Sequence, residues 1–172
     1  MRIFSEFMSD TINILQIIRG TTVDGPGFRT SIYFAGCNHK CPGCHNPSSW
    51  DFSAGSHFTM EELIEIIKEE DFDVTLSGGD PLYHPEFVKN LISHINSIGH
   101  KVWIYTGFRW EEIIESPVLF DAVKEADVIV DSPFILSLRD TDLLFRGSSN
   151  QRIINIKKST PESIVLWQKE EN

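Results

Sequence analysis

Hydrophobic and polar positions along the chain alternate between two patterns, one typical of strands and one typical of helices. Short apolar or β-branched runs predict strands over residues 12–18, 29–36, 73–80, 101–105, 127–130 and 152–156. Apolar residues three and four positions apart predict helices over 59–71 and 84–99, and helical segments between Trp110 and Lys124. Strands and helices that alternate in this way are typical of a largely parallel sheet, so the predicted fold class is α/β.

The two longer helices carry start and stop signals. Thr59 followed by Glu62 is the pattern of a capping box, in which each side chain bonds the backbone N–H of the other residue. This helix is expected to end near Asp71. In the next helix Pro85 stands early and Gly99 stands at the end, where these residue types are preferred.

The number of strands limits which α/β fold the chain can adopt. Five or six main strands cannot close like an eight-stranded barrel, and the 172 residues fall short of the roughly 250 typical of that fold. An incomplete (β/α) barrel with a mostly parallel sheet is therefore predicted. It would form a single domain over residues 1–172, with a core at about 12–156 and a peripheral C-terminal segment at 157–172.

Polar and glycine residues follow four of the predicted strands. They are the cysteine-containing loop after Phe34, the stretch 77–80, Thr106 with Gly107, and Asp131. In parallel α/β sheets, function gathers at the carboxyl edge, where these strand ends lie side by side. One shared site at that edge is therefore expected.

Charge and hydropathy argue against two classes of partner. Acidic residues outnumber basic ones by 25 to 15, giving a net charge of −10 without any basic run. Nucleic-acid binding depends on Lys and Arg that neutralise phosphates, so it is not expected as the main activity. The start of the chain does not read as a signal peptide, and no run approaches the roughly 20 apolar residues that span a bilayer. We expect a cytoplasmic protein with reduced thiols and no membrane partner.

All three cysteines lie in one short stretch, "GCNHKCPGCHNP". Cys37, Cys41 and Cys44 have the spacing C-x3-C-x2-C, which lets successive thiolates converge on one inorganic centre. Zinc would require a fourth ligand, for which His39 or His45 is available. An iron–sulfur cube held by three thiolates would instead keep one iron without a protein ligand. Such an iron can bind a substrate directly while passing it an electron, which is chemistry that cofactors supply and proteins position.

Several motifs carry a family resemblance. The cysteine spacing followed by the glycine pair of "SGGDP" resembles the radical S-adenosylmethionine superfamily, and "DGPGFRTSIYFAGCNHKCPGCHNP" resembles the activating enzymes of glycyl-radical proteins. Taken together, "CPGC", "SGGDPL", "VWIYTGF", "VDSPF" and "RGSSNQR" are similar to the activating proteins of anaerobic, class III ribonucleotide reductases. The similarity runs from about residue 20 to 156.

The resemblance implies a specific oxidoreductase activity on a radical-SAM-type incomplete barrel. Cys37, Cys41 and Cys44 would bind a [4Fe-4S] cluster whose open iron is chelated by the amino and carboxylate groups of S-adenosylmethionine. Reductive cleavage would give methionine and a 5'-deoxyadenosyl radical, which takes a hydrogen atom from a glycine of the reductase's large subunit and leaves a glycyl radical. A low-potential donor such as flavodoxin or ferredoxin would supply the electron. No catalytic residue beyond the cluster ligands is predicted.

Residues at the other strand ends are candidate contacts to S-adenosylmethionine. Gly78 and Gly79 lack side chains, so the backbone can approach a ligand closely, and Ser77 and Asp80 add polar groups able to meet an ammonium. Thr106 and Asp131 are further candidates, the latter for the ribose hydroxyls or the methionyl group. The alternative interpretation of Gly78 and Gly79 is a simple glycine pair at a strand-to-turn junction. The alternative interpretation of Asp131 is a cap on a helix or turn.

The third cysteine has unusual neighbours for the superfamily. An aromatic residue often precedes this cysteine, whereas the chain has Gly43 before Cys44. His45, just after it, is the candidate ring beside the cofactor, and a zinc ligand is its competing interpretation.

Three rival functions follow from the same residues. The chain could activate a different glycyl-radical enzyme, act on a small molecule by radical chemistry, or be a zinc-stabilised binding module. Metal content separates the last of these, because about four irons with sulfides exclude zinc and a single zinc excludes the cluster.

Overall fold

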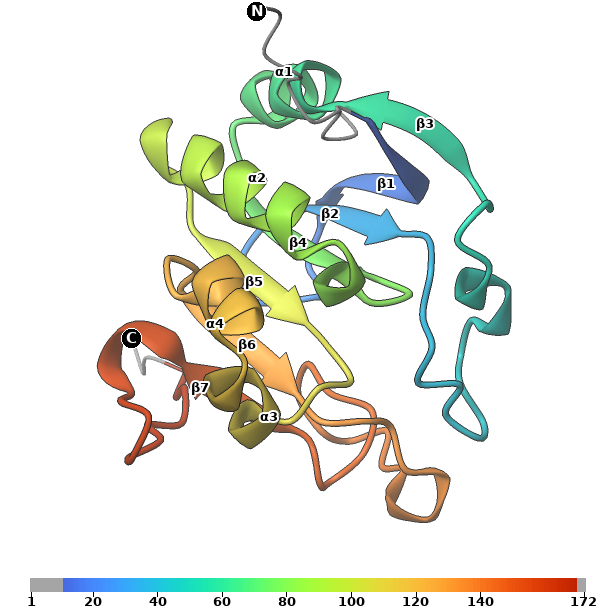
Figure 1. The fold of residues 1–172 in the computed structure, drawn as a ribbon, viewed down its shortest axis with the longest axis vertical. Coiled ribbons are helices and arrows are strands. Elements are labelled where there is room, and N and C mark those ends of the chain that lie inside the picture. The colour runs from blue at the N-terminus through green and yellow to red at the C-terminus, as the bar shows by residue number, and fades with distance from the viewer. Residues whose placement is uncertain (1–10, 170–172) are drawn as a thin grey trace, which may run out of the picture.

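The computed structural model describes residues 11–169, which are built around one mixed sheet (Figure 1). Residues 1–10 and 170–172, which the predicted single domain includes, lie outside the described range. The sheet has seven strands in the order β3-β1-β2-β4-β5-β6-β7. Their bounds are β1 Thr11–Thr21, β2 Arg29–Phe34, β3 Ser56–Thr59, β4 Asp73–Gly78, β5 Val102–Tyr105, β6 Val128–Asp131 and β7 Arg152–Asn155.

The centre of the sheet is parallel and both sides are antiparallel. Strands β2, β4, β5 and β6 pair in parallel, whereas β1 runs antiparallel to β2 and to β3, and β7 runs antiparallel to β6. The predicted α/β class is therefore confirmed, with an open sheet of mixed direction. The sequence analysis missed β3, because "SHFT" has no buried side chain and is held by pairing with residues 11–14 of β1.

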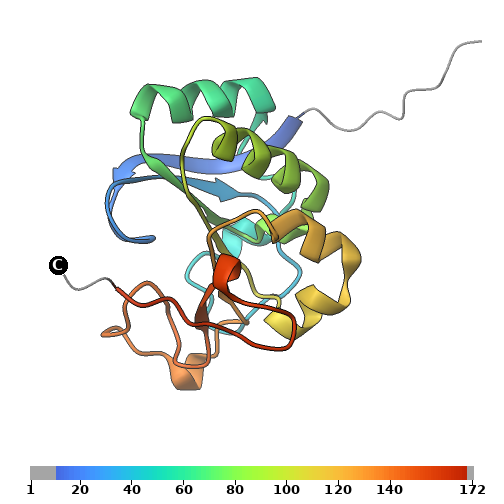
Figure 2. The same cartoon turned by 90° about the vertical axis from the view of Figure 1, so that its left-hand side faces the viewer.

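Four helices pack on one face of the sheet: α1 Met60–Glu70, α2 Pro85–Ser97, α3 Trp110–Glu115 and α4 Pro117–Val123. Figure 2 shows them along the upper and right sides of the molecule, while the segments that follow β6 lie in its lower part. All four helices contribute buried residues to the main hydrophobic core. Within residues 11–169, no helix is long and apolar enough to cross a bilayer.

The side chains of successive residues in β5 lie on opposite faces of the sheet. Val102 and Ile104 belong to the main core beneath the helices, and Trp103 belongs to a second cluster on the other face. This is the two-residue period of a strand. The ring of Trp167, from the C-terminal segment, lies 5.1 Å from that of Trp103, and the ring of Phe145 lies 5.6 Å from it.

The predicted helix caps are present. Glu62 N–H donates to Thr59 Oγ1 at 3.1 Å, and Thr59 N–H donates to Glu62 Oε2 at 2.7 Å, which completes the capping box. Helix α1 ends at Glu70 and is capped by Asp71, whose φ of 55° is left-handed. Helix α2 begins at Pro85, and Gly99 beyond its end has a φ of 90°.

Candidate functional site

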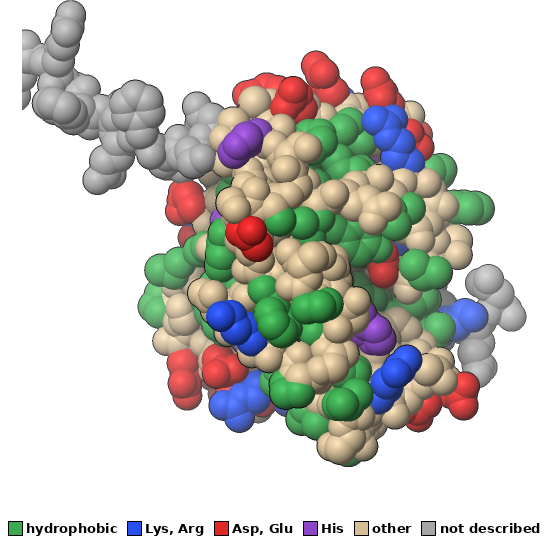
Figure 3. All heavy atoms as spheres, turned by 90° about the vertical axis from the view of Figure 1, so that its right-hand side faces the viewer, with side chains coloured by type: hydrophobic (Ala, Val, Ile, Leu, Met, Phe, Trp, Pro, Cys, Tyr) green, Lys and Arg blue, Asp and Glu red, His purple; other side chains and the backbone are tan. Residues whose placement is uncertain are grey.

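The parallel strands all end at one edge of the sheet, where the predicted loops meet. A cavity of about 630 Å³ opens there. Its wall includes the predicted residues Cys37, Cys41, Cys44, His45, Ser77, Gly78, Gly79 and Thr106. Figure 3 views the molecule from the side toward which the parallel strands point in Figure 1, and hydrophobic side chains form several patches on it. The structure thus brings most of the predicted site residues around one opening.

The three cysteines are free thiols with different surroundings. Cys37 is buried, whereas Cys41 and Cys44 are partly exposed. Burial raises the pKa of the Cys37 thiol. The backbone N–H groups of His39 and Lys40 stabilise the thiolate and offset part of that rise in pKa. Burial also raises the pKa of Cys41, and the backbone N–H of Phe134 lowers that pKa in part. The backbone N–H groups thus favour the thiolate form of two of these cysteines, which is the form that binds metal.

This donor set fits an iron–sulfur centre. Three thiols without disulfide partners line one open cavity, and cysteine thiolates are the usual ligands of such centres. Within residues 11–169, no group of three or more His, Cys, Asp or Glu side chains is placed to hold a metal ion. The two histidines considered as zinc ligands have other contacts: His39 Nε2 lies 2.8 Å from Asp80 Oδ2, and the His45 ring lies 5.3 Å from that of Phe134.

The glycine pair after β4 has a packing role. A Cβ on Gly79 would lie 2.5 Å from the carbonyl oxygen of Gly36, and a Cβ on Gly78 would overlap the backbone of Phe34. Gly79 N–H donates to Phe34 O at 2.8 Å, and Asp80 N–H donates to Gly36 O at 3.0 Å. The pair therefore lets the end of β4 lie directly against the start of the cysteine loop. Contact of Gly78 and Gly79 with a ligand stays a prediction.

Asp80 is fully buried and its carboxylate is held by protein donors. Oδ1 accepts from Leu82 N–H at 2.9 Å, and Oδ2 accepts from Thr106 Oγ1 and Gly107 N–H, both at 2.9 Å, and contacts His39. Asp80 is not part of the cavity wall, although Thr106 is. This network was not predicted from the sequence, because its partners lie up to 41 residues away along the chain.

Asp131 is also buried and engaged by the protein. One oxygen accepts from Trp110 N–H at 2.8 Å and so caps α3, and the other accepts from Arg152 Nε at 3.1 Å. Asp131 lies outside the cavity wall, which its neighbour Ser132 joins. Its position matches the alternative interpretation as a helix cap, and its contact with the cofactor stays a prediction.

Gly43 turns the chain between the second and third cysteines. Its φ is +77°, and a Cβ there would lie 2.8 Å from Leu136 Cδ1. His45 is exposed on the cavity wall beside Phe134, which the sequence analysis did not single out. The location of Phe134 just beyond the end of β6, in "VDSPF", is the signal that could have identified it.

Comparison with known proteins agrees with the donor set. A family model described as a 4Fe-4S single cluster domain matches residues 23–154. An anaerobic ribonucleoside-triphosphate reductase-activating protein from Salmonella typhi is 36% identical over 146 residues, which cover 78% of this chain and 93% of that protein. Proteins of the same name from Escherichia coli strain K12 and Enterobacteria phage T4 are 34% and 38% identical, over 78% and 76% of this chain and 93% and 86% of theirs. The chain belongs to this family.

The cavity wall also carries two tyrosines, Tyr33 and Tyr105, which were not predicted as site residues. Tyr33 donates its hydroxyl hydrogen bond to Asp24, and Tyr105 donates to Phe145 O at 2.8 Å. Burial raises the pKa of both phenols, so both carry their protons at neutral pH. Among the described residues of the wall, Arg146 is the only Lys or Arg. Charged side chains are therefore few on this wall, with Asp24 as its acidic member.

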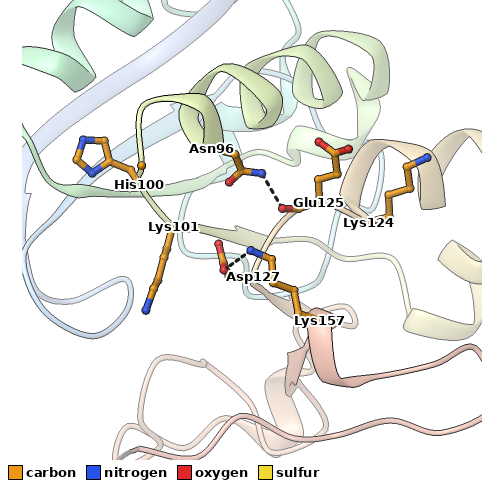
Figure 4. Close-up of a pocket in the computed structure, with 8 residues that line it drawn as sticks. Asn96, His100, Lys101, Lys124, Glu125, Asp127 and Lys157 are labelled. Carbon is orange, nitrogen blue, oxygen red and sulfur yellow. Dashed lines mark hydrogen bonds and ion pairs between the residues drawn. The ribbon is translucent and has the colours of Figure 1, made fainter.

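A second cavity, of about 530 Å³, lies at the other edge of the sheet (Figure 4). Its polar groups bond mainly to one another: Lys157 Nζ donates to Asp127 Oδ1 at 2.7 Å, and the Asn96 amide donates to Glu125 O at 2.9 Å. Asp127 also accepts from Val102 N–H at 2.8 Å, at the start of β5. These contacts join strand starts to helix ends, and none of the predicted site residues lies here.

Proposed function

We propose that this chain activates an anaerobic ribonucleotide reductase by forming a glycyl radical on the large subunit. One electron would cleave S-adenosylmethionine into methionine and a 5'-deoxyadenosyl radical. That radical would take a hydrogen atom from the reductase glycine, giving 5'-deoxyadenosine and the glycyl radical. The observation that carries the proposal is the set of three free thiols on one cavity, in a chain whose relatives are named for activating this reductase.

Different residues of the cavity wall would bind the cluster and S-adenosylmethionine. Cys37, Cys41 and Cys44 would hold a [4Fe-4S] cluster, which supplies the electron and offers one iron to the substrate. The backbone of 77–79 would meet the methionyl ammonium, and the rings of His45 and Phe134 would lie beside the adenine. Thr106, which is on the same wall, would border the bound molecule.

The open sheet suits a protein substrate. We assign it to the incomplete (β/α) barrel of the radical S-adenosylmethionine enzymes, because its central strands are parallel and its edges do not join. A glycine that lies in another protein must enter on a polypeptide loop, and an unclosed barrel leaves room for it. A cytoplasmic electron donor such as flavodoxin or ferredoxin would complete the system, without a nucleic-acid or membrane partner.

Radical transfer to the reductase tests the proposal. The reconstituted chain, a low-potential reductant, S-adenosylmethionine and the large subunit of a class III reductase are incubated without oxygen. Electron paramagnetic resonance is expected to show a glycyl doublet that depends on every component, and a Cys41→Ala variant is expected to form none. A doublet of equal size with Cys41→Ala, or cleavage of S-adenosylmethionine that never yields a doublet, would contradict the proposal.

A further inference from the structure

A buried carboxylate joins three segments around the site. Asp80 has no exposed surface, and its four neighbours come from the cysteine loop, from the turn after β4 and from the end of β5. The sequence separations of 41, 26 and 27 residues to His39, Thr106 and Gly107 show that most of these contacts are tertiary. A buried carboxylate requires such donors, because an ionised group without partners is costly to bury.

His39 is the part of the cysteine loop that reaches this carboxylate. It stands midway between Cys37 and Cys41, and its Nε2 lies 2.8 Å from Asp80 Oδ2. The imidazole packs edge-on against Phe108, with ring centres 4.6 Å apart. Gly107 makes room for it, since a Cβ there would lie 2.5 Å from the His39 ring. The ring is therefore enclosed on several sides as well as bonded.

We propose that His39 and Asp80 form a clamp that positions the cysteine loop for cluster binding. Both are positioning residues in this account: Asp80 acts through His39, and neither is assigned as a ligand of the metal or of S-adenosylmethionine. The clamp fixes the loop at a point between two ligand cysteines, so it limits how far their sulfurs can separate. This inference rests on the proposed function in one respect, namely that the three cysteines hold the cluster.

The contacts of Asp80 indicate that loss of the His39 contact would affect the cysteine loop more than the rest of the fold. Asp80 keeps its bonds to Leu82, Thr106 and Gly107 when the His39 contact is removed, so the ends of β4 and β5 stay joined. The cysteine loop, in contrast, loses its bond to the carboxylate. Outer partners of metal ligands commonly change metal affinity by roughly 10- to 100-fold when they are mutated.

Two substitutions of His39 separate the hydrogen bond from the packing. His39→Leu fills much of the ring's space and removes the donor, whereas His39→Gln keeps an N–H group that can reach Asp80. Asn38→Ala is the matched control, because Asn38 is the exposed neighbour in the same loop and is not part of the cavity wall. Circular dichroism of the metal-free chains checks that each variant folds.

The reconstituted full-length chains are compared by the rate of iron release to a chelator and by the electron paramagnetic resonance spectrum of the reduced cluster. His39→Leu is expected to release iron roughly 10- to 100-fold faster than wild type. His39→Gln and Asn38→Ala are expected to stay within about twofold of wild type with an unchanged spectrum, since the loop remains clamped.

Other results would overturn the clamp. Wild-type release from His39→Leu would show that the bond does not hold the loop. Fast release from His39→Gln with an altered spectrum would show that the imidazole is itself a ligand. A wild-type chain that binds no four-iron cluster would instead refute the proposed function, and the clamp with it, before any variant is compared.

Discussion

At the scale of single residues, the strand-end carboxylates show how burial decides a role. Asp80 and Asp131 follow parallel strands, and both were predicted to contact a cofactor, Asp80 also because it stands beside the glycine pair. Both are fully buried, and both accept hydrogen bonds from backbone N–H groups and side chains of other segments. Sequence could place them at the right edge, but it could not show which donors would fold against them.

Gly79 provides a test at the same scale. We expect Gly79→Ala to lower cluster occupancy, because the new Cβ would lie 2.5 Å from Gly36 O and 2.8 Å from Ser49 O, both backbone atoms at the cysteine loop. Overpacking of this kind costs roughly 1–3 kcal/mol. Urea unfolding and iron content after reconstitution measure the two effects.

Gly27→Ala is the control for the Gly79 substitution. Gly27 has a φ of +72° but nothing within 4 Å of an added Cβ, so its strain, roughly 1–2 kcal/mol, does not reach the cysteines. It should lose stability and keep its iron. Full iron content in Gly79→Ala, at wild-type stability, would show that the close approach at Gly79 is unimportant.

At the scale of elements, the hydrophobic pattern located most of the fold. The six predicted strands and the capped helix at Thr59 are all present, because the strands are runs rich in apolar or β-branched residues and the helix has buried residues three and four positions apart. Strand β3 has no such signal, since its side chains are largely exposed and it depends on pairing with β1. The cysteine loop and the β4 turn were recognisable from their spacing, whereas Phe134 and the tyrosines of the wall depend on how distant segments meet.

An ion pair between α3 and β7 gives a pH-dependent prediction. Arg152 Nη1 and Nη2 donate to the two Glu111 oxygens, each at 2.9 Å, and these bonds lower the Glu111 pKa from 4.5 to about 2. Because the folded pKa is the lower one, the stabilisation is complete above about pH 4.5 and is lost as pH falls through about 2. Glu111 is half exposed, so the contribution is at most roughly 1 kcal/mol.

Glu111→Gln should therefore be less stable than wild type near neutral pH, and the difference should shrink toward pH 2. Urea unfolding across this range measures it. Glu115→Gln, on the same helix and exposed, serves as control and should show no comparable convergence. If the difference in the free energy of unfolding between Glu111→Gln and wild type is constant with pH, the ion pair does not stabilise the folded state.

At the scale of the whole molecule, the two edges of the sheet differ in structure. The amino edge is closed by mutual contacts such as Lys157 with Asp127, while the carboxyl edge opens into the cavity with the three thiols. Helices cover one face, and Trp167 with Phe145 covers part of the other, so the thiols lie at an edge rather than within the core. The thiols therefore lie where a protein partner could reach them, as the proposed function requires, while two hydrophobic clusters support the fold.

On the proposed function, the three cysteines hold a four-iron cluster with one iron left open to S-adenosylmethionine. Electron paramagnetic resonance of the reduced, anaerobically reconstituted chain, recorded before and after S-adenosylmethionine is added, tests it most directly. We expect a [4Fe-4S] signal whose shape changes when S-adenosylmethionine binds. An identical signal at saturating S-adenosylmethionine, or a colourless protein with a single zinc, would contradict it.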